Sequence, residues 1–426
     1  MAAFLLPTAV EQGYSGIVAY IPYPATVPVR EILEWLTDVV TSYNGKEERY
    51  KLRILPRHEI EYIIPLNNEI RSEIISLVLA YMNDKWAVPL WSAAQDLESV
   101  TDNSSSITCK TDGYPFAPNT LVMLYDPSSG KSDLLKVTAV NLNVLTIDVR
   151  SYSYAGYTAG AMLVPVRLGT NKTIIQTPLT SFDSQIRLSY DLDSYIYSDY
   201  SDIPITKLVD EFFDDTQYRG RDGFHFTGYF LQGKSELERK LDSMPKRVDS
   251  MVGSFTKLFR KPVQWHTPFA FLFDTASTEQ RDFFGFVSYV LWLQRVSGKY
   301  RSFWIPSYEN DIQMLGSTPK VVTNQIKGHW FRASSFESAR SDIAIEYRSS
   351  TGIVWHFTEA TPAYSSSAPN ELTWQLTDPM PSVPRENILT VSYLYHCRLD
   401  QDRIVFEWSG GGIVRCSILI KEIPFK

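Results

Sequence analysis

The sequence predicts an α+β, β-rich fold of two tandem related modules, each a short helix packed on antiparallel β-strands, plus an extended N-terminal arm. One observation is an aromatic-proline stretch that occurs twice, as "WAVPLW" at 86–91 and "FWIPSY" at 303–308. Another is that the same order of β-prone and helical patterns surrounds both copies. The third is the length of the chain, because 426 residues are more than a domain with a single hydrophobic core usually contains.

The first helix is expected where Ile70, Ile74, Leu77, Val78 and Tyr81 recur at steps of three and four residues, with Asn68 as its cap. Just before it, "EIEYIIPL" at 59–66 is a short apolar, β-prone run.

The second helix shows the same periodicity in a set of apolar residues, namely Phe283, Phe286, Val287, Val290 and Leu291. It follows the β-prone run "TPFAFLFD" at 267–274, and Ser277 with Gln280 fits a capping box. Each helix then leads into one copy of the aromatic-proline stretch.

Downstream of each copy, a β-hairpin is expected around Gly and Ser turn residues, at 120–140 and at 342–361. A further strand follows each hairpin, and an acidic turn then leads into a closing strand. We match the closing strand of 181–191 with that of 398–408. Six matches in one order favour a duplicated module over chance.

The predicted boundaries divide the chain into four segments. They are an extended, Pro-rich N-terminal arm and lead-in at 1–48, module 1 at 49–194, a connecting segment with short helices at 195–261, and module 2 at 262–426.

Composition and charge exclude several classes of protein. Hydrophobic residues make up 44% and charged residues 21%, which is typical of globular chains. A net charge of −7 without a long basic run argues against nucleic-acid binding. The sequence has no apolar run long enough for a membrane span and no convincing signal peptide at its N-terminus. Cys397 and Cys416 could pair, but folding in a reducing cytoplasm is the simpler interpretation of three unpatterned cysteines.

The residues singled out as a structural or interface motif are the aromatics, prolines and following aspartates of the two copies: Trp86, Pro89, Trp91, Asp96, Phe303, Trp304, Pro306, Tyr308 and Asp311. Proline fixes its own φ and favours an extended residue before it, so the flanking rings are held in fixed directions. Two interpretations stay open. The rings either seal each module's own core, or some of them anchor a neighbouring subunit.

No catalytic, cofactor-binding or metal-binding residues are predicted. Glu59 with Glu61, or Asp214 with Asp215, could supply paired carboxylates, but neighbouring acids on one element rarely converge on a substrate. The acidic stretch "LDQD" at 399–402 does not fit a calcium-binding loop. Nucleotide-binding and hydrolase motifs are missing, so we expect no enzyme.

Three segments resemble tail proteins of bacteriophages. They are "EWLTDVVTSYNGKEERYKLRILPR" at 34–57, "GKYRSFWIPSYENDI" at 298–312, and the closing strands at 399–424. The second is similar to the aromatic-proline segment of minor tail and baseplate proteins. The first copy departs from that pattern, since Ala87 stands where the second copy has Trp304.

The resemblance implies a non-catalytic structural component of a tail tip or baseplate. Such a protein would lie in the virion, after assembly in the host cytoplasm. Its partners would be copies of itself in a ring, as trimer or hexamer, and other tail tube, hub or fibre proteins. The alternative is a carbohydrate-binding adhesin that stacks exposed Tyr and Trp rings on sugars.

Overall fold

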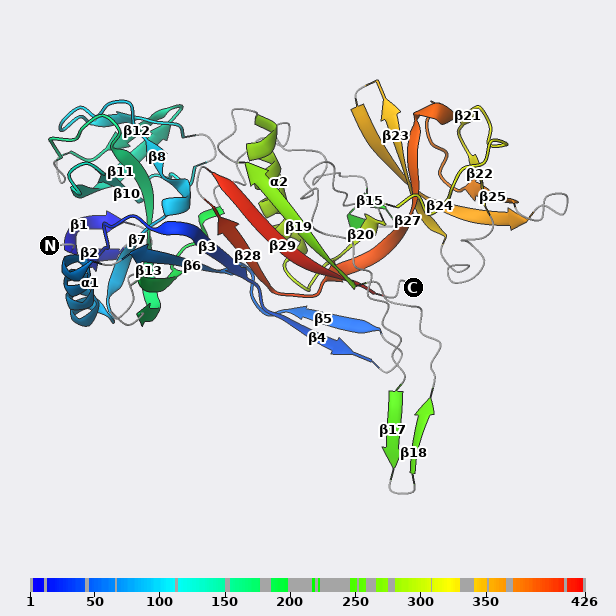
Figure 1. Ribbon diagram of the computed structural model, residues 1–426, viewed down its shortest axis with the longest axis horizontal. Coiled ribbons are helices and arrows are strands. Elements are labelled where there is room, and N and C mark those ends of the chain that lie inside the picture. Colours follow the sequence, from blue (N-terminus) through cyan, green and yellow to red (C-terminus); the bar gives the residue numbers. More distant parts are fainter. Residues whose placement is uncertain are drawn as a thin grey trace.

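In the computed structural model of this chain, the described residues are 3–10, 14–42, 46–65, 67–111, 114–149, 154–176, 185–197, 217–218, 221–222, 246–250, 253–257, 266–274, 280–307, 309–329, 341–350, 352–364, 371–409 and 412–423. They form a β-rich fold with a large antiparallel sheet and two helices (Figure 1). We refer to residues 3–197 as the first half and to residues 266–423 as the second half.

The elements of the first half, in chain order, are β1 (Ala3–Val10), β2 (Tyr14–Ala19), β3 (Thr26–Glu34), β4 (Thr37–Thr41), β5 (Glu47–Lys51), β6 (Arg57–Pro65), α1 (Asn68–Tyr81), β7 (Lys85–Pro89), β8 (Gln95–Asp96), β9 (Ser106–Thr108), β10 (Leu121–Tyr125), β11 (Ser132–Asn141), β12 (Val144–Ile147), β13 (Met162–Gln176) and β14 (Gln185–Leu192).

In the sequence between the two halves there are two short pairs of strands. They are β15 (Gln217–Tyr218) with β16 (Arg221–Asp222), and β17 (Lys246–Ser250) with β18 (Gly253–Lys257). The elements of the second half are β19 (His266–Asp274), α2 (Gln280–Val296), β20 (Ser302–Pro306), β21 (Val321–Val322), β22 (Gln325–His329), β23 (Asp342–Ser349), β24 (Gly352–Tyr364), β25 (Glu371–Leu376), β26 (Val383–Pro384), β27 (Ile388–Leu399), β28 (Arg403–Trp408) and β29 (Ile413–Glu422).

Both helices lie where the apolar periodicity predicts them. The side chain of Asn67, one residue before the predicted cap Asn68, accepts a hydrogen bond from the Ile70 backbone N–H at 2.8 Å and caps α1. The predicted cap is therefore wrong by one position. The expected capping residue Ser277 of α2 lies outside the described residues. In α2, Phe286 packs edge-on against Phe406 and Trp408 of β28, with ring centroids 5.6 and 5.3 Å apart.

Strand pairing follows a similar scheme in the two halves. In the first, β6 pairs with β14, β14 with β13, and both β7 and β10 pair with β13. In the second, β19 pairs with β29, β29 with β27 and β28, and both β20 and β23 pair with β27. Pro89 lies opposite Val166, and Pro306 lies opposite Leu394. Of the two segments matched as closing strands, β14 pairs with β6 and β13, whereas β28 pairs with β29 and β3.

The two predicted hairpins are present as β10 with β11 and β23 with β24. Each belongs to a small lobe of β-strands beside the main sheet, seen at the upper left and upper right of Figure 1. In the first lobe, buried apolar side chains from the stretch Leu97 to Leu163 form a hydrophobic cluster that is separate from the main core.

The N-terminal residues predicted as an extended arm are extended, but they lie within the sheet. β1 pairs with β2, and Ala19 of β2 lies beside Trp86 of β7. β3 pairs with β6 on one side and with β28 on the other, so it joins the first half to the second. Within the connecting segment at 195–261, the described residues include the strand pairs β15–β16 and β17–β18, so the helix expected over 234–250 gives way to a strand at Lys246–Ser250. The other residues on which helices were expected lie outside the described set.

Candidate functional site

The aromatic-proline residues of the first copy pack inside the first half. Trp86 is buried, donates its indole N–H to the Tyr81 carbonyl at 3.0 Å, and lies 5.8 Å from the Tyr190 ring. Pro89 is buried on the same strand, whereas Trp91 is half-buried and meets Tyr125 edge-on at 5.7 Å.

The second copy is packed more deeply. Phe303 is buried against Trp292 of α2, with 5.1 Å between ring centroids. Trp304 points to the other side of β20, where it lies 4.9 Å from the His396 ring. Pro306 is also buried, and Tyr308 lies outside the described residues. Buried rings of this kind hold the chain's own core together.

The two aspartates of the motif differ in role. Asp96 is exposed on β8. Asp311 is buried, accepts a hydrogen bond from the Tyr393 backbone N–H at 2.9 Å, and also accepts one from the Ser307 hydroxyl. Asp311 thereby fixes the loop after β20 onto β27.

A polar junction forms where the two halves meet, and Asp402 is at its centre. Its carboxylate accepts backbone N–H groups of Thr37 and Lys299, each at 2.9 Å, and its carbonyl accepts the Trp35 N–H at 2.9 Å. Asp402 therefore ties together the end of β3, the end of α2 and the turn before β28. We call this cluster the Asp402 junction.

The backbone at the end of α2 is shaped to admit this carboxylate. Gly298 has φ +65°, a left-handed conformation that favours glycine. A Cβ at this position would overlap the Asp402 Oδ1 atom and touch Trp35. The close approach of three chain segments thus requires glycine at residue 298.

The β4–β5 hairpin adds an ion pair to the junction. Arg398 donates to both carboxylate oxygens of Glu47, at 2.7 and 3.0 Å, and both side chains are nearly buried. Lys51 also donates to the Ser297 hydroxyl at 3.0 Å. Burial alone would raise the pKa of Glu47, but the hydrogen bonds and charge of Arg398 outweigh it and hold that pKa below its ordinary value.

We expect the Glu47–Arg398 pair to make stability depend on pH. A carboxyl with a lowered folded-state pKa stabilises the fold above its unfolded value of 4.5, and that contribution is lost as pH falls through the folded value. Glu47→Gln should therefore lower the free energy of unfolding by about 2 kcal/mol at pH 7 and by much less near pH 3. Chemical denaturation at both pH values measures this. Glu48→Gln, at the exposed neighbouring position, is the control, and an equal effect at both pH values would contradict the assignment.

A buried polar group also joins β3, β6 and β28. The Glu31 carboxylate lies 2.7 Å from His58 Nε2 and accepts the Trp408 indole N–H at 3.0 Å. Tyr195 and Tyr197 flank the His58 ring at 5.8 and 5.6 Å. Because each of the three strands contributes one member, this group fixes the register across the boundary between the halves.

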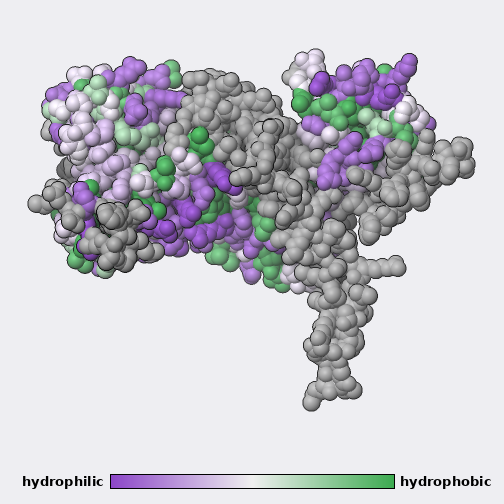
Figure 2. Space-filling view, in the orientation of Figure 1, coloured by the Kyte–Doolittle hydropathy of each residue, from purple (hydrophilic) through white to green (hydrophobic). Residues whose placement is uncertain are grey.

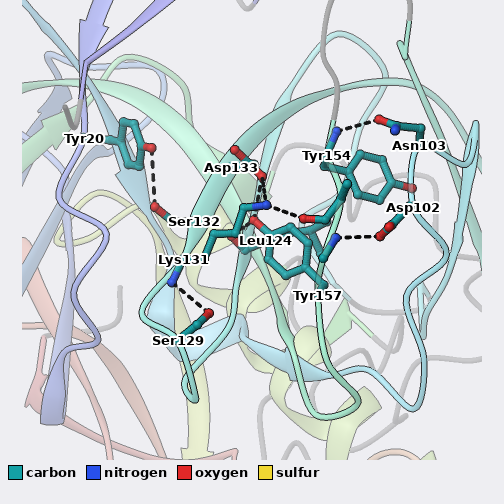
Figure 3. A network of polar contacts seen from close by, with 12 residues as sticks. Tyr20, Asp102, Asn103, Leu124, Ser129, Lys131, Ser132, Asp133, Tyr154 and Tyr157 are labelled. Atoms are coloured by element: carbon teal, nitrogen blue, oxygen red, sulfur yellow. Dashed lines mark hydrogen bonds and ion pairs between the residues drawn. The ribbon is translucent and has the colours of Figure 1, made fainter.

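A second polar network lies in the first lobe (Figure 3). Tyr157 donates its hydroxyl to Asp133 at 2.9 Å, and Lys131 lies 3.7 Å from the same carboxylate. Tyr20 of the loop after β2 meets Ser132 at 3.4 Å. Burial, followed by the charge of Asp133, raises the pKa of Tyr157. These contacts tie the lobe to the N-terminal strands.

Glu59, one of the acids considered for catalysis, makes structural contacts. Glu59 is buried, forms an ion pair with Lys172, and accepts the Ser189 hydroxyl at 2.7 Å. Asp214 and Asp215 lie outside the described residues. Cys109, Cys397 and Cys416 are buried and form no disulfide, and burial raises the pKa of Cys416 to about 12.

Within the described ranges, no three His, Cys, Asp or Glu side chains gather as a metal site would require. Neither helix of the described part is long and apolar enough to cross a lipid bilayer.

The motif residues that are buried or half-buried lie in two separate places, Asp96 is exposed, and sequence reasoning missed the Asp402 junction. The segments 34–57, 298–312 and 399–424, which sequence analysis singled out, each contribute a residue to this junction. Compared with known proteins, the chain matches no protein-family model and no curated protein sequence.

Proposed function

We propose that this chain is a structural component of a bacteriophage tail tip or baseplate, where copies form a ring that links the tail tube to the host-recognition apparatus. One observation carries the proposal. The three segments that resemble tail proteins, 34–57, 298–312 and 399–424, meet at Asp402 through hydrogen bonds of 2.9 Å. These segments are far apart in the sequence, yet each resembles tail proteins and all three are in contact. This combination supports the proposal that they belong to one inherited structural unit.

The similar pairing schemes support the finer proposal of two tandem modules. In chain order, α1 lies between β6 and the aromatic-proline strand β7, and α2 lies between β19 and the aromatic-proline strand β20. Each aromatic-proline strand pairs with a long strand of its own half, β7 with β13 and β20 with β27. A duplicated module offers two comparable faces per chain, which suits closed rings built from repeated contacts.

A sheet edge that has no second partner among the described strands supports assembly with further copies. In the first half, β6 pairs with β14 on one side and with β3 on the other. Its counterpart β19 pairs with β29 alone among the described strands. A strand of another chain can add to an edge of this kind. The proposed partners are copies in a trimer or hexamer, with tube, hub or fibre proteins beyond them.

The test is immunogold labelling of tailed phage particles with antibodies raised against the purified chain. We expect label at the tail tip, and label at the head or along the whole tail would contradict the proposal. A glycan array with the same purified chain examines the adhesin alternative. Specific sugar binding without label at the tail tip would favour that alternative.

A further inference from the structure

One face of the β4–β5 hairpin is apolar and exposed. In the described residues, 14 large apolar side chains are exposed, and six of them lie between residues 36 and 55: Leu36, Val40, Tyr50, Leu52, Ile54 and Leu55. Apolar residues appear in Figure 2 along the lower middle edge, where Figure 1 places this hairpin. Exposed apolar side chains concentrated in this way usually mark an interaction surface.

The pairing register places four of these six side chains on the same face. Leu36 lies opposite Leu52, and Asp38 lies opposite Tyr50, with Val40 two positions further along β4. Opposite residues of an antiparallel pair share a face, as do alternate residues along each strand. We call this face of the hairpin the outer face. Its members are Leu36, Asp38, Val40, Ser42, Lys46, Glu48, Tyr50 and Leu52.

Hydrogen bonds show which way the backbone groups of β4 point. The Leu52 N–H donates to the Leu36 carbonyl at 2.9 Å, and the Ser42 N–H donates to the Lys46 carbonyl at 2.8 Å. Hydrogen-bonded and non-hydrogen-bonded pairs alternate along an antiparallel ladder. The even-numbered residues from 36 to 42 therefore direct their N–H and C=O groups toward β5, and the odd-numbered residues direct theirs away from it.

The odd-numbered residues of β4 thus line an edge of the hairpin. Thr37, at the start of the strand, donates its N–H to the Asp402 carboxylate at 2.9 Å, as this alternation requires. Val39 and Thr41 lie nearer the turn, and among the described strands β4 pairs with β5 alone. A strand of another chain can add at backbone groups presented in this way.

The two strands of the hairpin differ in how far their side chains oppose such an addition. β5 reads Glu-Glu-Arg-Tyr-Lys, and charged side chains, lysine above all, discourage pairing at an edge. β4 reads Thr-Asp-Val-Val-Thr, in which every residue but Asp38 is β-branched and therefore suited to a strand. The edge of β4 is consequently the one that favours a further strand.

We propose that two copies of this chain associate by antiparallel pairing of their β4 strands about a two-fold axis at Val40. In this register Val39 of each copy lies opposite Thr41 of the other, and the two residues exchange N–H to C=O hydrogen bonds. Val40 lies opposite Val40 of the second copy as a non-hydrogen-bonded pair, in which the side chains are close. An axis at Val39 would instead need the Thr37 N–H, which Asp402 already accepts.

The charges of the outer face favour a second copy as the occupant of this edge. In the proposed register Asp38 lies opposite Ser42 of the second copy, and Ser42 is bonded to Lys46 within its own hairpin. Each Asp38 therefore lies in one row with Lys46 of the other copy. Since Asp38 is the one charged residue of β4, the pairing sets no like charges opposite each other. A two-fold interface requires a self-complementary surface of this kind.

Opposite charges at residue 40 of the full-length chain test the two-fold axis. Val40→Lys and Val40→Glu each set like charges face to face, so each should raise the self-dissociation constant at least about tenfold in sedimentation velocity. An equimolar mixture of the two variants should associate again. Val40 is exposed, and Leu142→Lys with Leu142→Glu, at an exposed position elsewhere, are matched controls that should associate as the native chain does. A monomeric native chain, or a mixture no better than either variant alone, would overturn the proposal.

A proline at residue 41 tests the backbone pairing. Thr41→Pro removes an N–H that points away from β5, so the hairpin keeps its own hydrogen bonds while each copy loses one to the other. The self-dissociation constant should rise at least about tenfold, with chemical denaturation confirming an unchanged fold. Thr41→Val retains the N–H and should associate as the native chain does. Association unaffected by the proline would rule out pairing at this edge. Labelling of phage particles does not depend on this contact, so its failure and failure of the proposed function are distinguishable.

Discussion

Replacing Asp402 with alanine is expected to lower the free energy of unfolding by roughly 3 kcal/mol, because two backbone N–H groups lose a charged acceptor. These are the N–H groups of Thr37 and Lys299, each 2.9 Å from the carboxylate. Chemical denaturation of the full-length chain measures the change. Gln401→Ala is the control, since that half-exposed side chain makes only one hydrogen bond, to the Ser417 carbonyl at 3.2 Å.

A double-mutant cycle separates the junction from a general loss of stability. Gly298→Ala should be costly in the native background, where the new Cβ overlaps Asp402 Oδ1 at a residue with φ +65°. In the Asp402→Ala background that overlap is gone, so the added cost of Gly298→Ala should be smaller by about 1 kcal/mol. Strictly additive costs, or an Asp402→Ala chain as stable as the Gln401 control, would show that the junction does not hold the halves together.

Local patterns predicted the local elements. The three- and four-residue spacing of Ile70, Ile74 and Leu77 predicted α1, and Gly and Ser residues between apolar runs predicted both hairpins. The capping error at α1 is of one residue, because Asn67 and Asn68 are equally able to cap and only the backbone geometry selects between them.

The position of β3 could not be predicted in the same way. Its residues pair with β28, so Glu31 lies opposite Phe406, which is remote in the sequence. The proline-rich composition around it indicates extended backbone, but it carries no information on which strands will be its neighbours. The sequence therefore predicted an arm, whereas the structure has a strand within the sheet.

The candidate site was missed for a related reason. "LDQD" at 399–402 is indistinguishable in sequence from a solvated acidic loop, and Asp402 acquires its role only when α2 and β3 end beside it. The aromatic-proline motif was conspicuous because large rings and prolines stand out in a sequence. Its best-packed members, Trp86 and Phe303, are buried within the chain. The conspicuous residues belong to the hydrophobic core, whereas the role of Asp402 is evident only from its contacts in the folded chain.

Replacing each tryptophan of the first motif with alanine should show how much each ring contributes to the stability of the fold. Trp86→Ala removes a buried ring that contacts Tyr190 and donates to the Tyr81 carbonyl, so it should lower the free energy of unfolding by roughly 3–5 kcal/mol. Trp91→Ala removes a half-buried ring with an edge contact to Tyr125, and should cost about 1–2 kcal/mol. Thermal and chemical denaturation of both variants measures the difference.

The same pair of variants bears on the interface interpretation of the motif. If the motif serves only the core, Trp91→Ala should leave the self-association of the folded chain unchanged in sedimentation velocity. A Trp91→Ala chain that folds normally but fails to associate would instead make the first motif part of the contact between copies.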